Sequence, residues 1–150
     1  MQISPRYFLQ HDSDAPETHQ IGGAEVVVYS RRCPEKETVN EDAAAIIPVG
    51  DQSFVLVVAD GVGGYRGGAQ ASNLTLQLLA ETIARDCQDP TLLRVSILDG
   101  IERANSALRE QNTKACTTLA AVEFNAGEVR PYHVGDSMIL ICGQRGRIHY

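Results

Sequence analysis

The sequence has little of what marks several common classes of protein. It contains no tryptophan, and aromatic residues make up 5% of its 150 positions. No run approaches the 18 apolar residues typical of a membrane-spanning helix, so no such helix is predicted. Its longest run of basic residues is Arg31-Arg32, and the formal net charge is -6. A surface that neutralises nucleic-acid phosphates requires clustered basic side chains, so nucleic acid is excluded as a partner.

Cysteine is also sparse. No C-x-x-C pair occurs, which argues against a zinc finger and against a secreted disulfide framework. Each cysteine lies in or beside an apolar segment, so we expect buried, reduced thiols. The N-terminus lacks the apolar stretch of a signal peptide, and the cytoplasm is the predicted compartment. The four cysteines are Cys33, Cys87, Cys116 and Cys142.

What is present is the composition of one globular domain, with 43% apolar and 21% charged residues. Residues 1–23 are expected to be a leader or loop, and residues 24–150 the domain. Alternation and helical periodicity predict strands, then two helices, then strands, an order typical of an α+β fold with antiparallel pairing. The expected strands are 24–30, 43–49, 54–59, 116–124, 128–134, 138–142 and the start of one at 147–150, with a loop over 60–68 and helices over 68–87 and 90–112.

Acidic side chains stand at the ends of the predicted strands. Glu41 and Asp42 precede one strand, Asp60 ends the apolar run FVLVVA, and Asp136 occupies a tight turn. Carboxylates beside glycines suit a hard divalent cation such as Mg²⁺ or Mn²⁺. Two such metals activate a water and neutralise phosphate oxygens during in-line attack. The alternatives are turn chemistry for Asp136 and a solvated loop for Glu41-Asp42. A purely structural role is less expected for Asp60, because a charge at the end of a core strand is costly without a partner.

These residues fall in four blocks: NEDA at Asn40–Ala43, VVADGVGGYRGGAQAS at Val57–Ser72, CTTLAAVEF at 116–124 and YHVGDSMILI at Tyr132–Ile141. In this order and spacing the sequence resembles the metal-dependent Ser/Thr protein phosphatases of the PPM, or type-2C, family, from Glu25 to Tyr150. The resemblance implies a four-layer αββα sandwich. It also implies hydrolysis of phosphoserine or phosphothreonine in a phosphorylated protein substrate at a centre of two Mn²⁺ or Mg²⁺ ions.

The resemblance also implies roles for individual residues. Asp60 matches the carboxylate that bridges the two metals, and the backbone carbonyl of Gly61 matches a ligand of one of them. Glu41 and Asp42 match the pair that holds metal-bound waters. Asp136 matches a ligand of a third, weaker metal site found in some members.

The sequence also departs from the family pattern. Two further metal-binding aspartates stand in the C-terminal half of the family domain, and this sequence reaches Tyr150 without them. We therefore expect a domain truncated after its N-terminal half to two-thirds, completed by a further chain segment or a second copy. The alternative function is a truncated or non-catalytic phosphatase-like binding or regulatory module. The position expected for a phosphate-binding arginine is Glu37, which leaves Arg32 and Lys36 as candidates beside the alternative of a solvated basic loop.

A dinucleotide-binding loop is a third reading of the glycine-rich segment. Its G-x-G-x-x-G pattern begins with Gly61 and Gly63 but meets Arg66 where the third glycine is required. Asp60 would also repel a pyrophosphate. Both features disfavour this reading.

Overall fold

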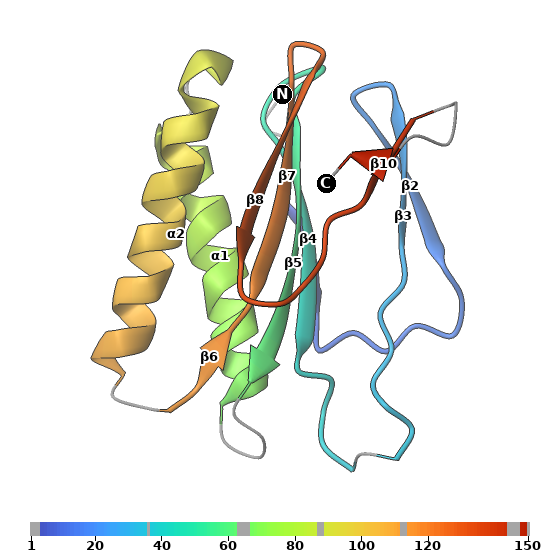
Figure 1. Ribbon diagram of the computed structural model, residues 1–150, viewed down its shortest axis with the longest axis vertical. Coiled ribbons are helices and arrows are strands. Elements are labelled where there is room, and N and C mark those ends of the chain that lie inside the picture. The colour runs from blue at the N-terminus through green and yellow to red at the C-terminus, as the bar shows by residue number, and fades with distance from the viewer. Residues whose placement is uncertain are drawn as a thin grey trace.

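The computed structural model describes residues 4–35, 37–62, 67–86, 89–111, 114–143 and 148–149. Two helices cover one face of a six-stranded antiparallel sheet, and a two-stranded hairpin lies on its other side (Figure 1). The sheet has the order β1-β4-β5-β7-β8, and β6 pairs with the end of β5. Its strands are β1 (Arg6–Leu9), β4 (Asp42–Pro48), β5 (Phe54–Val62), β6 (Cys116–Thr117), β7 (Leu119–Asn125) and β8 (Glu128–Val134).

The hairpin is formed by β2 (Glu17–Ile21) and β3 (Ala24–Val28), and a small second pair by β9 (Ile141–Cys142) and β10 (Ile148–His149). The predicted helices are confirmed as α1 (Gly68–Asp86) and α2 (Leu93–Glu110). A short 3₁₀ helix, η2 (Pro90–Leu92), precedes α2, and Asp89 caps it by accepting a hydrogen bond from the Thr91 N–H at 2.8 Å. None of the helices in the described ranges has the length and apolar character needed to cross a membrane.

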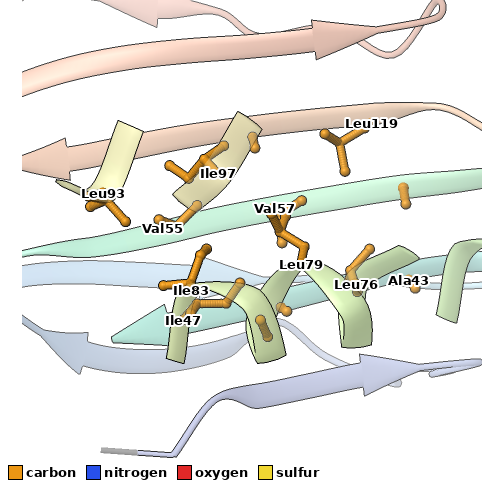
Figure 2. Packing of buried hydrophobic residues seen from close by; sticks show 14 residues of the cluster. Ala43, Ile47, Val55, Val57, Leu76, Leu79, Ile83, Leu93, Ile97 and Leu119 are labelled. Carbon is orange, nitrogen blue, oxygen red and sulfur yellow. The ribbon is translucent and has the colours of Figure 1, made fainter. Parts of the chain in front are cut away.

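Alternation along β4 and β5 divides the apolar residues between two faces. Ile47, Val55 and Val57 point toward the helices and pack in one buried cluster with Leu76 and Leu79 of α1 (Figure 2). The intervening residues Ala44 and Ile46 of β4 form a second cluster beneath the hairpin with Phe8 of β1 and Val26 of β3. The helix, sheet and hairpin layers correspond to three layers of the expected αββα sandwich, and the α+β class is confirmed.

The expectation of a leader or loop over residues 1–23 is not met, because β1 and β2 lie within this segment. β1 pairs with β4 from Arg6 opposite Ile46, and β2 pairs with β3. The polar composition of β2 concealed it, since only one side of this strand is half-buried. The Gly22-Gly23 turn, with φ of +55° and +77°, is the kind that closes a two-residue hairpin.

Three other expectations differ from the structure. The predicted strand over 138–142 is reduced to Ile141–Cys142, and the one over 116–124 is interrupted at Thr118. Cys33, Cys116 and Cys142 are free but exposed, where buried thiols were expected. These cysteines lie in a loop or in two-residue strands, which have too few pairing residues to bury a side chain. Cys87 lies outside the described residues.

Candidate metal centre

The pairing of β4 with β5 places Asp42 directly opposite Asp60. The short turn between the strands fixes this register, because the N–H groups of Val49 and Gly50 both donate to the Ser53 carbonyl, at 2.8 and 3.0 Å. Side chains directly opposite each other in an antiparallel pair have Cβ atoms about 4.5–5.5 Å apart, and like charges there destabilise the sheet. A divalent cation bound by both carboxylates would offset such repulsion.

Asp42 and Asp60 open into a cleft of about 430 Å³ on the hairpin side of the sheet. Both residues are exposed, so a dissolved ion or a phosphate group can reach them. The cleft is bounded by the loop after β3, by β4 and β5, and by the turn after β8. Its lining residues are Tyr29, Ser30, Arg31, Asp42, Ala43, Ala44, Val58, Ala59, Asp60 and Ser137.

Glu41 lies beside this pair, where β4 and β5 meet the start of α1. The Gly61 N–H donates to the Glu41 carbonyl at 3.2 Å, and the buried Ser72 hydroxyl of α1 donates to the same carbonyl at 2.6 Å. A Cβ atom added to Gly68 would lie 2.3 Å from Glu41 Oε1 and 2.7 Å from the Gly61 carbonyl oxygen. Because Gly68 has no side chain, Glu41 Oε1 and the Gly61 carbonyl oxygen can both lie close to it.

This donor set fits the metal that the sequence predicts. The oxygen donors stand in two pairs, Asp42 with Asp60 at the cleft and Glu41 with the Gly61 carbonyl beside Gly68, and oxygen is the ligand that Mg²⁺ and Mn²⁺ prefer. Among the described residues, no group of three or more His, Cys, Asp or Glu side chains could hold a metal ion. A cation here would therefore depend on the Gly61 carbonyl and on waters as well, which is how Mg²⁺ is commonly held.

Asp136 is exposed in the turn after β8, and its neighbour Ser137 lines the cleft. Gly135 has a φ of +95°, and a Cβ there would lie 2.8 Å from the Thr118 methyl carbon, so the turn packs closely on Thr118. The structure thus pairs Asp42 with Asp60 and places Glu41 Oε1 and the Gly61 carbonyl beside Gly68, at the same ends of β4 and β5. Asp136 is placed next to the cleft through Ser137 and is not among its lining residues.

Of the two residues predicted to bind phosphate, the structure describes Arg32 but not Lys36. Arg32 forms an exposed ion pair with Asp12, Nε to Oδ2 at 3.1 Å, and is not among the cleft residues. Lys36 lies outside the described residues. Arg31 lines the cleft, and a hydrogen bond to Tyr29 raises the pKa of its guanidinium, so it stays cationic there.

Sequence reasoning missed the small polar residues that hold the backbone of Asp42 and Asp60. Asn40 is buried, accepts the Asp42 N–H at 3.1 Å, and donates to the His11 carbonyl at 2.6 Å. Thr118 accepts the Asp60 N–H at 3.0 Å. These residues, with Ser72 and Ser137, stand inside or beside the motif blocks. A single sequence gives no signal that separates such hydroxyl and amide groups from ordinary turn residues.

The chain is similar to known protein phosphatases. The profile of the protein phosphatase 2C family matches residues 31–150. The structure of a serine/threonine phosphatase from S. agalactiae is similar with a TM-score of 0.65 and 26% identity, over 97% of this chain and 54% of that one. The Mycobacterium tuberculosis serine/threonine phosphatase PstP/Ppp has a TM-score of 0.52 and 23% identity, over 88% and 47%, and at that identity shows the fold alone. No curated protein matches the chain.

The chain therefore spans about half the length of the solved phosphatases that it resembles. The family match begins in the loop that carries Arg31 and includes every residue of the predicted metal centre. With four fifths of the chain matched and the same arrangement of sheet and helices, the chain belongs to the protein phosphatase 2C family.

Proposed function

We propose that the chain is part of a cytoplasmic, metal-dependent phosphoprotein phosphatase that hydrolyses phosphoserine or phosphothreonine at a centre of two Mn²⁺ or Mg²⁺ ions. The observation that carries the proposal is the pairing of Asp42 with Asp60 at the mouth of a cleft, beside the converging oxygens of Glu41 and Gly61. Family membership supports the reaction class.

Divalent metals at such a site supply an activated water and neutralise phosphate oxygens. Asp60 and the Gly61 carbonyl are the proposed direct ligands. Glu41 and Asp42 hold and orient waters around the ions, and Asp136 contributes to a weaker third site. Backbone contacts hold part of this arrangement in advance, since the Gly61 N–H and the Ser72 hydroxyl both donate to the Glu41 backbone carbonyl. Donors held in place before binding need little rearrangement when charge develops on the phosphate.

A phosphate group also requires a positive side chain near the carboxylates. Arg31 lines the cleft together with Asp42 and Asp60, so we add it to Arg32 and Lys36 as a candidate. In Arg32, Asp12 competes with a phosphate group for the guanidinium, although such exposed ion pairs are weak and exchange readily. Comparing Arg31→Gln with Arg32→Gln separates the two, because the proposal expects the former to raise KM for a phosphopeptide more than the latter.

A second candidate is a phosphatase-like module that binds metal without turnover. It is favoured by the small number of side-chain ligands in the described residues. Under this reading a further chain segment or a second copy supplies the remaining ligands. Asp60→Asn would then weaken metal binding, while the unmodified chain would show no hydrolysis.

The test is hydrolysis of p-nitrophenyl phosphate and of a phosphothreonine peptide by the chain with Mn²⁺, with EDTA, and as the Asp60→Asn variant. Metal-dependent turnover that is lost in Asp60→Asn supports the phosphatase proposal and excludes the non-catalytic module. A folded chain that binds Mn²⁺ but lacks turnover supports the module. Turnover that continues unchanged in Asp60→Asn contradicts both.

A further inference from the structure

The segment between β6 and β7 contains a break in the sheet ladder at Thr118. The Thr118 N–H donates to the Asp60 carbonyl at 2.9 Å, as in a regular antiparallel pair. The Asp60 N–H, however, donates to the Thr118 side-chain oxygen at 3.0 Å. The Thr118 carbonyl instead accepts the Thr117 hydroxyl at 3.0 Å, and the same hydroxyl lies 2.9 Å from the Asp60 carbonyl. A side chain thus takes the place of a backbone acceptor at the residue that bears the Asp60 carboxylate.

The same Thr118 hydroxyl reaches the turn that carries Asp136. Its Oγ1 lies 2.5 Å from the Ser137 hydroxyl oxygen, and either group can donate. The Thr118 methyl group packs against Gly135, where a Cβ would lie 2.8 Å away. A ring nitrogen of His133 donates to the Ser137 carbonyl and closes the turn. Thr118 is 6% exposed, so water does not readily replace these bonds.

We infer that Thr118 is a positioning residue that fixes the spacing between Asp60 and the Asp136 turn through its hydroxyl, and so sets the metal affinity of the site. The inference rests on the proposed function, because it takes Asp60 and Asp136 as metal-site residues. Residues that orient metal ligands through hydrogen bonds alter metal affinity by about 10–100-fold when they are replaced.

Two substitutions separate the roles of the Thr118 hydroxyl and methyl groups. Thr118→Val keeps the volume and removes the hydroxyl, whereas Thr118→Ser keeps the hydroxyl and removes the methyl. Thr75→Val is the matched control. Thr75 is also 6% exposed, and its hydroxyl has no hydrogen-bond partner among the described residues. Asp60→Asn is measured in parallel as the reference for loss of the site.

The experiment is a Mn²⁺ titration of each purified chain, followed by electron paramagnetic resonance of the free ion, with the melting temperature recorded for every variant. We expect Thr118→Val to weaken Mn²⁺ binding at least about tenfold. Thr118→Ser and Thr75→Val should bind within about threefold of the unmodified chain. A purely structural role would lower the melting temperature of Thr118→Val and leave its Mn²⁺ affinity unchanged, and that result overturns the inference.

Two further outcomes are distinguishable. If Asp60→Asn binds Mn²⁺ as tightly as the unmodified chain, the proposed function fails together with the inference. If Asp60→Asn loses binding while Thr118→Val keeps it, only the inference fails. Should Thr118→Val not fold, Ser137→Ala removes the other half of the bond from an exposed turn. Weaker Mn²⁺ binding by Ser137→Ala then supports the positioning role, and unchanged binding overturns it.

Discussion

Replacing Gly61 with alanine tests how closely β5 approaches the start of α1. A Cβ at this position would lie 2.1 Å from the Gly68 carbonyl oxygen, 2.3 Å from the Gly68 carbonyl carbon and 2.8 Å from the Glu41 carbonyl oxygen. Ordinary van der Waals contact begins at 3.4 Å, so β5 and α1 must separate by about 1 Å. All three atoms belong to the backbone, and no side-chain rotation relieves the clash.

The expected loss follows from these distances. Overpacking costs about 1–3 kcal/mol, and the upper end applies because two backbone segments must move apart. For a chain of this length, about 3 kcal/mol corresponds to a fall in melting temperature of about 6–12 °C. We also expect weaker Mn²⁺ binding, since the Gly61 carbonyl is a proposed ligand and shifts with the strand.

Thermal unfolding followed by circular dichroism measures the stability change. Gly50→Ala is the matched control, because a Cβ at Gly50 meets nothing within 4 Å. If Gly61→Ala melts within about 1 °C of Gly50→Ala, the close approach of β5 to α1 is wrong, and the site geometry built on it is wrong as well.

Three other predictions concern the core and a buried polar cluster. Glu123 is 1% exposed and accepts two hydrogen bonds from Arg130 at 3.0 Å and one from the Tyr132 hydroxyl. Glu123→Ala should cost about 2–4 kcal/mol in urea unfolding, somewhat less than a fully buried pair because Arg130 is partly exposed, and a loss below about 1 kcal/mol would contradict this. Burial and the Glu123 hydrogen bond raise the pKa of Tyr132 to about 12. Unfolded tyrosine ionises near about pH 10, so this stability is present below pH 10 and is lost as the pH rises through about 12. Tyr132→Phe should therefore lose less stability over this range than the unmodified chain, and parallel curves would refute the assignment. Leu79→Ala, at a position with 0% exposure, should cost about 2–5 kcal/mol in the same unfolding assay, and a neutral result would contradict the described core.

Periodicity predicted the elements that build the layers. The alternation along Phe54–Val62 and the helical spacing of Leu76, Leu79 and Ile83 reflect burial on one face, which a single sequence displays directly. The hairpin strand β2 escaped because its residues are polar and only half-buried on one side. Its stability depends on pairing with the adjacent β3 and on packing of Ile21 against the cluster that β1 and β4 contribute to, and the contact with β4 is distant in sequence.

The charged residues of the site could be predicted from the sequence. Asp60 stands out because a carboxylate ends a core strand, and the register that sets it opposite Asp42 follows from a short turn. The role of Thr118 was not predictable, since a hydroxyl that replaces a backbone acceptor depends on a local break in pairing between β6 and β7. Arg31 and Arg32 differ only in which way each points, and sequence cannot decide that.

The central claim is that the oxygen donors at the ends of β4 and β5 form a divalent metal site. The most direct test is the Mn²⁺ affinity of the unmodified chain, of Asp60→Asn and of Asp51→Asn, which alters an exposed carboxylate at the opposite end of the same two strands. The account predicts that Asp60→Asn weakens binding at least about tenfold and that Asp51→Asn leaves it unchanged. Equal Mn²⁺ affinities for all three chains would contradict it.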